Sequence, residues 1–319
     1  MALIDDDLST SFGRARSHLV GPDGRSYGEF RAGLNPRWWL LWADLGLTWA
    51  LLAGVVVVLA WLQGVGWPVA VGAVIIGTGV IGVLVHRVNL FLHEGAHFNL
   101  APQRWNDLLT NIAAGALVLG DVRTYRPIHM AHHRNLGTVR DTERTYFSRL
   151  DLRFLQRCAL GMHVVAVLRS RNEAPTDENR DAPWTVLAGC VGHAAIVVAA
   201  ALTGHWILAV AWTLGVVSVF PLVTSVRQLS EHRPPDADGS TDYSSVDIGA
   251  HTRMFDRAPL SWVFGAAGFD HHLLHHWDPK VSYTRLPELR SWLEETEVGP
   301  VVDRRESTYV GTVQRLWRR

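Results

Sequence analysis

Nine histidines, in three clusters and one single position, are the residues of this sequence best suited to chemistry. The first cluster has two histidines four residues apart, and the second and third both read H-x-x-H-H. Spacings of three and four put side chains on one face of a helix, so each cluster can direct two or more imidazoles at one metal ion. The nine candidate ligands are His93, His97, His129, His132, His133, His232, His272, His275 and His276.

The first cluster, "HEGAH", also matches H-E-x-x-H, the helix of zinc metalloproteases in which Glu94 would be the general base. A catalytic zinc takes three protein ligands and water, which leaves most of the clustered histidines unused. Nine imidazoles are instead the supply for two ions with four or five nitrogen ligands each, and two redox metals held together indicate oxygen activation. An intramembrane zinc protease and a zinc-binding receptor-like protein stay open as alternatives.

Long apolar runs alternate with charged segments along the 319 residues, which predicts one multi-span membrane domain. Four runs are long enough to cross a hydrocarbon core, with tryptophans at their ends. The predicted spans are Trp38 to Leu62, Pro68 to Leu92, Ala182 to Leu202 and Trp206 to Val226. Arginines do not form a stripe with interleaved aromatics, so nucleic acid is excluded as a partner.

The distribution of basic residues predicts the orientation. Between the first two spans and between the last two lie short uncharged turns, whereas Lys and Arg crowd the other segments. The positive-inside rule then puts both termini in the cytoplasm. An acidic start without an apolar run predicts that no signal peptide is cleaved. The preference for Arg over Lys indicates a GC-rich bacterial genome, and the predicted location is the cytoplasmic (inner) membrane. The predicted parts are 1–37 (cytosolic), 38–98 (first hairpin), 99–181 (cap), 182–232 (second hairpin) and 233–319 (C-terminal cap).

The second and fourth spans are expected to continue as helices beyond the lipid. His93 lies 25 residues after Pro68, and His232 lies 25 residues after Ile207. At 1.5 Å per residue both lie at about 37 Å, just past a core of roughly 30 Å. Pro221 is expected to kink the fourth helix. Two charged apolar segments, from Arg104 and from Leu150, are predicted to lie at the interface.

The order and spacing of these clusters resemble those of the integral-membrane fatty acid desaturases and their hydroxylase and ketolase relatives. "VRQLSEHR" is similar to the segment after the last helix, and "DHHLLHHWDPKVSYTRLPEL" to the third histidine box and its tail. The resemblance runs from Trp38 to about Leu293. It implies an all-α integral membrane fold, with four transmembrane helices and a cytosolic helical cap that carries the histidine boxes, and it implies that the nine histidines bind two iron ions.

The resemblance also implies residues around the ligands. Gln228, one turn before the single histidine, would approach the metals through water, and Glu94 would orient a ligand imidazole. Asp270, Asp141 and His271 are expected to act in the same outer layer. Two features depart from the family pattern: Leu274 stands inside the third box, which often reads H-x-E-H-H, and "WDP" follows it. Both are expected where a substrate would approach.

The implied activity is O₂-dependent desaturation of an acyl chain, with a hydroxylase or ketolase acting on a lipid or specialised metabolite as the alternative. Electrons must then reach the irons from a carrier. The sequence has neither the cysteine set of a ferredoxin or rubredoxin nor a dinucleotide-binding fingerprint. A separate ferredoxin and its reductase are therefore the expected partners.

Overall fold

The computed structural model describes residues 11–166, 184–256 and 259–317, and their regular secondary structure is almost entirely helical. The chain divides into two compact units. Unit 1 comprises Met1–Trp38, Ile128–Asp151 and Arg227–Arg319, and unit 2 comprises Trp39–Pro127 and Leu152–Val226. Each unit is described by itself.

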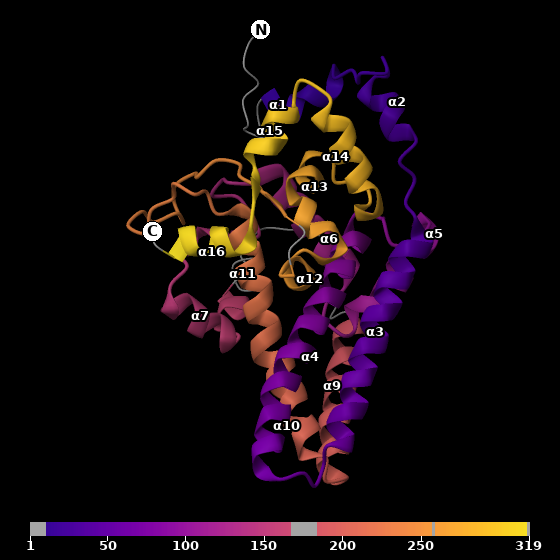
Figure 1. The fold of residues 1–319 in the computed structure, drawn as a ribbon, viewed down its shortest axis with the longest axis vertical. Coiled ribbons are helices and arrows are strands. Elements are labelled where there is room, and N and C mark those ends of the chain that lie inside the picture. Colours follow the sequence, from indigo (N-terminus) through magenta and orange to yellow (C-terminus); the bar gives the residue numbers. More distant parts are fainter. Residues whose placement is uncertain (1–10, 167–183, 257–258, 318–319) are drawn as a thin grey trace. The chain divides into compact units, whose positions relative to one another are not determined.

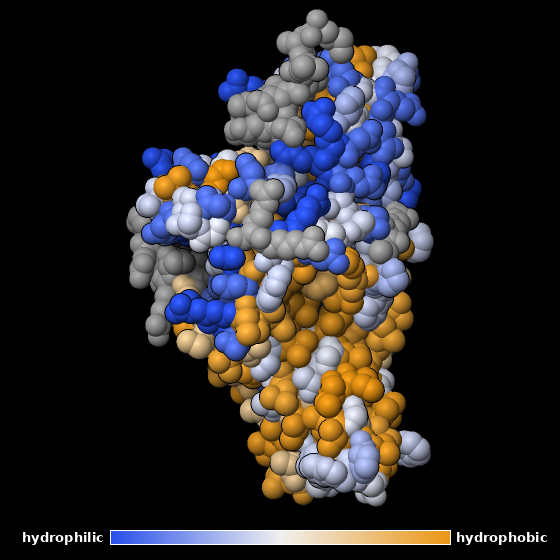
Figure 2. All heavy atoms as spheres, turned by 60° about the vertical axis from the view of Figure 1, so that its left-hand side comes forward, coloured by the Kyte–Doolittle hydropathy of each residue, from blue (hydrophilic) through white to orange (hydrophobic). Residues whose placement is uncertain are grey.

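Four helices are long and apolar enough to cross a membrane. They are α3 (Trp38–Trp61), α4 (Trp67–Ala96), α9 (Trp184–Leu202) and the continuous helix Trp206–His232, made of α10 (Trp206–Leu214), η4 (Gly215–Val219) and α11 (Phe220–His232). A helix satisfies its own backbone hydrogen bonds, which lipid cannot do. Figure 1 shows α3, α4, α9 and α10 running alongside one another, and Figure 2 shows apolar side chains gathered over this part of the molecule.

The predicted membrane fold is confirmed. α3 begins at Trp38 as predicted, and α4 and the fourth helix continue to Ala96 and His232. The predicted start of the third span at Ala182 lies outside the described residues. Trp61 and Trp67, at the turn between α3 and α4, are 81% and 72% exposed, as expected for indoles at the headgroup level.

The fourth helix widens where it packs against α4. A Cβ on Gly82 would lie 2.4 Å from the Val219 side chain, and one on Gly215 would lie 2.8 Å from the Ile81 side chain. Glycine at both positions therefore allows close helix contact. The π-helical segment Gly215–Val219 ends two residues before Pro221, which cannot donate to a carbonyl one turn earlier. The expected irregularity thus takes the form of a π-bulge.

An ion pair joins the first two spanning helices. Arg87 Nη2 donates to Asp44 Oδ1 at 2.9 Å, and the Arg87 side chain is only 7% exposed. An ionised group is costly within a span unless it is paired, so the pair explains how both residues are accommodated.

Unit 2 also contains the segment that follows α4. α5 (Gln103–Thr110) continues into a π-helical turn, η2 (Asn111–Gly115), before α6 (Val122–Asn135) begins. Asp121 accepts hydrogen bonds from the Arg123 backbone and from Asn111 Nδ2, so it caps α6 and fastens it to η2. α7 (Leu152–Ala159) is a further short helix. Membrane contact by these segments stays a prediction.

Short helices make up much of unit 1, and several of them share a hydrophobic core. They are α1 (Ser11–Arg14), η1 (Ala15–Ser17), α2 (Tyr27–Ala32), η3 (Arg144–Phe147), α12 (Ser261–Phe264), η5 (Ala266–His271), α13 (His272–Trp277), η6 (Tyr283–Arg285), α14 (Leu286–Glu294), α15 (Gly299–Arg304) and α16 (Tyr309–Trp317). Strands β1 (Met254–Phe255) and β2 (Glu306–Ser307) pair in parallel.

Both departures from the family pattern have a structural place in this core. Leu274 is fully buried in it, so the expectation that its side chain meets a substrate is wrong. Trp277 Nε1 donates to the Phe12 carbonyl at 2.9 Å. Asp278 Oδ2 accepts from Tyr27 at 2.7 Å and from Arg31 at 2.6 Å. The "WD" pair therefore fastens the N-terminal segment to α13.

Candidate metal centre

Unit 1 brings seven of the nine predicted ligands together from three helices. α6 supplies His129, His132 and His133, α11 supplies His232, and α13 supplies His272, His275 and His276. Ligand atoms within 4.8 Å of one another form groups that could hold a metal ion, among them His132 with His232 and His276, and His129 with His133 and His275. Five of the seven side chains are buried, and His133 and His276 are partly buried.

The backbone before α13 sets the direction of the third cluster. Ala267 and Gly268 have φ of 49° and 77°, so the chain turns through the left-handed region just before the helix. A Cβ on Gly268 would meet Tyr283 at 2.4 Å, which requires glycine there. Leu273 and Leu274 pack in the core of unit 1, and this anchors α13 with its imidazoles directed at α6 and α11.

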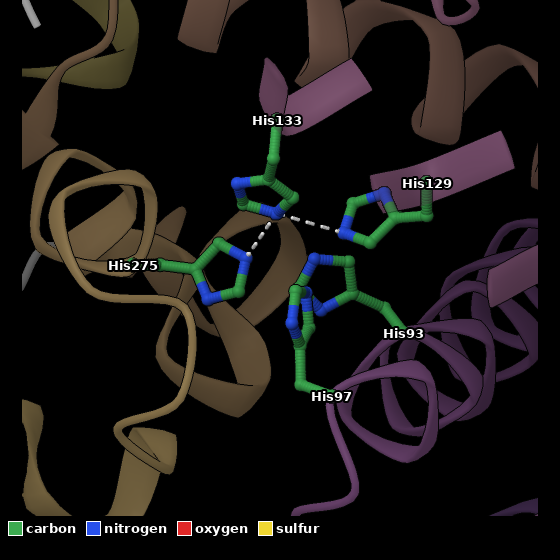
Figure 3. Close-up of side chains that lie close together, drawn as sticks. All are labelled: His93, His97, His129, His133 and His275. Atoms are coloured by element: carbon green, nitrogen blue, oxygen red, sulfur yellow. Dashed lines mark hydrogen bonds between the residues drawn. The ribbon is translucent and has the colours of Figure 1, made fainter. Parts of the chain in front are cut away.

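The imidazole nitrogens approach one another at distances typical of ligands on a common ion. His133 Nε2 lies 3.1 Å from His129 Nε2 and 3.2 Å from His275 Nε2 (Figure 3). His272 Nε2 lies 2.9 Å from His232 Nε2. A metal–nitrogen bond of about 2.1 Å puts neighbouring ligand nitrogens about 3.0 to 3.4 Å apart. A neutral imidazole has only one donor and one acceptor, so three rings meeting at one point are better explained by coordination.

Two carboxylates orient candidate ligand imidazoles by accepting a hydrogen bond from Nδ1, the ring nitrogen opposite Nε2. His132 Nδ1 donates to Asp141 at 2.8 Å, and His129 Nδ1 donates to Glu143 at 3.1 Å. Tyr146 also donates to Asp141, and burial raises the pKa of Tyr146, which keeps the phenol protonated as a donor. A proton fixed on Nδ1 leaves the Nε2 lone pair for a metal, the arrangement seen around many metal-binding histidines.

The end of α11 is held by backbone contacts. His232 Nδ1 donates to the His251 carbonyl at 3.1 Å, which again directs Nε2 at the cluster. Arg253 donates to the carbonyls of Ser230 and Arg233, both at 2.6 Å. The final carbonyls of a helix lack partners within the helix, so buried Arg253 caps this end and fixes the position of His232.

The electrostatics of the third cluster suit metal binding. Burial, reinforced by neighbouring imidazoles, lowers the pKa of His272, His275 and His276 well below 6.5. These rings are therefore neutral at neutral pH, which is the protonation state that binds metal. His276 Nε2 and His272 Nδ1 are buried and have no hydrogen-bond partner among the described residues. A metal would satisfy the His276 nitrogen.

In unit 2, the other two candidate ligands stand at the end of α4. The ring centroids of His93 and His97 are 5.0 Å apart and both side chains are buried (Figure 3). Arg126 donates to the carbonyls of Ala96 and Gly95 at 2.9 and 3.1 Å, and pairs with Asp107. The guanidinium thus caps α4 between its two histidines.

A scan of the sequence against protein families identifies the family of this chain. The model described as fatty acid desaturase matches residues 65–300, about three-quarters of the chain. The chain belongs to the fatty acid desaturase family. Among curated proteins, no match is found. Membership makes a desaturase- or hydroxylase-type activity the function class, in agreement with the resemblance on which the sequence analysis relied.

The residues predicted to contact the ligands of this desaturase-family site, rather than the metals, differ in what they bond to. Gln228 Nε2 donates to Glu143 at 2.5 Å, and Glu143 binds His129. Asp270 accepts from His271 at 2.8 Å, so these two are each other's partners. Glu94 Oε1 lies 3.7 Å from His93 Nδ1, longer than a hydrogen bond. The roles of these residues stay predictions. Gln228 is linked to a candidate ligand, His129, through Glu143.

Sequence reasoning missed several residues that hold this desaturase-family site together. They are Arg126, Glu143, Tyr146, Glu231 and Arg253. The one available signal was "DTE", an acidic pair that follows the second histidine box after a glycine turn. Two histidines outside the clusters bond to residues of unit 2 instead: His86 bonds to Thr224, and His193 to the Leu117 carbonyl.

Proposed function

We propose that this protein is an O₂-dependent di-iron enzyme of the membrane that introduces a double bond into an acyl chain. The observation that carries the proposal is the convergence of imidazole nitrogens at 2.9 to 3.2 Å. Di-iron use in this family and the histidine groups support two irons as the cofactor. Nitrogen-only donors do not select iron by themselves, so the choice of metal comes from the family.

Nine imidazoles would divide between two ions. Within unit 1, one ion would be held by His129, His133 and His275, and the other by His132, His232, His272 and His276, as the nitrogen contacts group them. His93 and His97, the i, i+4 pair on α4, would supply the two remaining ligands of the di-iron centre. The total matches the four or five nitrogen ligands per ion expected from the sequence.

The irons, when bound and reduced, would supply the activation of O₂ that C–H abstraction requires. The chain contributes geometry and exclusion of water. Asp141 and Glu143 hold two ligand imidazoles in one tautomer, and the buried ligands keep the reacting region dry. The apolar spanning helices would hold the protein in the lipid, where an acyl-chain substrate dissolves.

Electron supply, location and substrate belong to the same proposal. A separate ferredoxin with its reductase would deliver electrons from the cytoplasm, where both termini would lie. The substrate would be a lipid or an acyl chain in the inner membrane of a bacterium. Arginines on the cytoplasmic side would suit an acidic carrier.

Glu94 distinguishes this proposal from a zinc protease. A protease needs this carboxylate as its general base, so Glu94→Gln would abolish turnover. In a desaturase, Glu94→Gln should keep both irons and part of the activity. Loss of all activity with full metal occupancy, together with peptide cleavage by the wild type, would support the protease.

Product analysis by mass spectrometry tests the proposed reaction. The protein is supplied with a ferredoxin, its reductase, NADPH and membrane lipids, and the acyl chains are compared with those from a reaction without O₂. The expected product lacks two hydrogens. An acyl chain that has gained an oxygen would establish the hydroxylase alternative, and unchanged lipids from the iron-loaded enzyme would contradict an acyl substrate.

A further inference from the structure

Glu231 is a buried carboxylate beside the candidate metal centre that the mechanism above does not use. It directly precedes His232 at the end of α11 and is fully buried. One oxygen, Oε2, accepts from Arg227 Nη1 at 2.6 Å and lies 3.5 Å from His272 Nε2. The other oxygen, Oε1, has no hydrogen-bond partner among the described residues. A carboxylate oxygen buried without a partner is costly.

The side of the imidazole that Glu231 meets separates it from the orienting carboxylates. Asp141 and Glu143 meet Nδ1 of their histidines, on the ring edge away from the other imidazoles. Glu231 instead lies near Nε2 of His272, the same atom that approaches His232 Nε2 at 2.9 Å. Its carboxylate therefore lies on the edge where the metal would be. Ligand atoms of Glu231, His232 and His272 are within 4.8 Å of one another.

We propose that Glu231 is a tenth protein ligand, which binds through Oε1 to the iron that His232 and His272 share. The proposal rests on the di-iron function proposed above. Arg227 has a supporting role, because its guanidinium holds Oε2 and stacks on Phe269 at 4.1 Å. Phe269 stacks in turn on His272 at 5.1 Å. This layer fixes the carboxylate and the imidazole at one side of the ion.

A carboxylate on one ion makes the two irons different. One would have imidazole ligands alone, and the other would have imidazoles and a negatively charged oxygen, which favours the ferric state. The irons should therefore give two distinct Mössbauer doublets. The difference also gives each iron its own reduction potential.

Glu231→Gln and Arg227→Gln form a matched pair of variants, because each breaks the same ion pair but only the first removes the carboxylate. Both are purified in detergent at full length, reconstituted with ⁵⁷Fe under anaerobic conditions and measured for iron per chain and Mössbauer parameters. For Glu231→Gln we expect about one iron to be lost, or one doublet to shift, with iron binding about 10- to 100-fold weaker. Arg227→Gln should keep both irons and shift the doublets less, because it loosens the carboxylate without removing it.

Either single variant leaves a buried charge without its partner and so can fold poorly. The double variant E231Q/R227Q removes both charges, so it should fold and show the same change in iron as Glu231→Gln. Two irons with wild-type doublets in Glu231→Gln or in the double variant would overturn the ligand role of Glu231 and leave the di-iron proposal standing. Equal iron loss in Arg227→Gln and Glu231→Gln would also overturn it, because the ion pair alone would then explain the effect. A wild-type chain without two irons would overturn the proposed function itself.

Discussion

Replacing Arg126 with glutamine tests how the end of α4 is held. Arg126 donates to the Ala96 carbonyl at 2.9 Å and to the Gly95 carbonyl at 3.1 Å, and it stacks on Phe98 at 3.8 Å. Gly95 keeps a second donor, Asn106 Nδ2 at 2.7 Å, whereas no other bond to the Ala96 carbonyl is seen among the described residues. The variant therefore removes one charge-assisted bond, the stacking contact and the ion pair with Asp107, which keeps Arg123 and Asn106 as partners.

These losses set the size of the effect. A hydrogen bond to a charged group contributes about 2 kcal/mol and the stacking contact about 1 kcal/mol, so the end of α4 should be destabilised by about 3 kcal/mol. At about 1.4 kcal/mol per factor of ten, iron that depends on His93 and His97 should bind about 100-fold more weakly. Hydrogen exchange over residues 94–100 and iron retention against a chelator measure the two effects.

Arg123→Gln is the matched control. Arg123 contacts the same Asp107 at 3.5 Å, but its side chain is 73% exposed, so its loss should cost under about 1 kcal/mol. Arg126→Gln should show faster exchange and earlier loss of iron than Arg123→Gln. Identical behaviour of the two variants would refute the capping role of Arg126.

Three further predictions concern unit 1. Asp141→Asn should weaken iron binding about 10- to 100-fold, because the amide is a poorer acceptor for His132; wild-type resistance to a chelator would speak against this. The metal-free protein should lose stability as pH falls through about 6.5, by up to about 1.4 kcal/mol per pH unit for each of His272, His275 and His276. The reason is that burial lowers their pKa in the folded state, so the unfolded chain binds more protons; a melting temperature that stays constant from about pH 7 to about pH 5 would disprove it. Asp278→Ala should cost about 2 to 4 kcal/mol through the lost bonds to Tyr27 and Arg31, seen as a lower melting temperature, whereas Asp23→Ala at an exposed pair should change it little.

The spanning helices were predictable because they depend on local composition. Apolar length and terminal tryptophans placed the start of α3 at Trp38, and counting along the helix placed His93 and His232 beyond the lipid. The clusters were equally local, since three- and four-residue spacings already put imidazoles on one helical face. Fold class and family follow from these features and are confirmed.

Residues whose role depends on a distant partner could not be predicted. The Asp44–Arg87 pair joins positions 43 residues apart, and Gln228 meets Glu143 across 85 residues. Nothing in the neighbouring sequence marks Glu231 as different from any other glutamate near a helix end. Leu274 was assigned to a substrate surface because sequence spacing does not report which side of a six-residue helix faces the core.

Metal content is the most direct test of the central claim, that clustered imidazoles hold two iron ions. The full-length protein should contain about two irons per chain, measured by mass spectrometry of the metals. His275→Ala should lower this number, whereas His205→Ala, at the turn before α10, should not. One zinc per chain in the wild type, or unchanged iron in His275→Ala, would contradict the account.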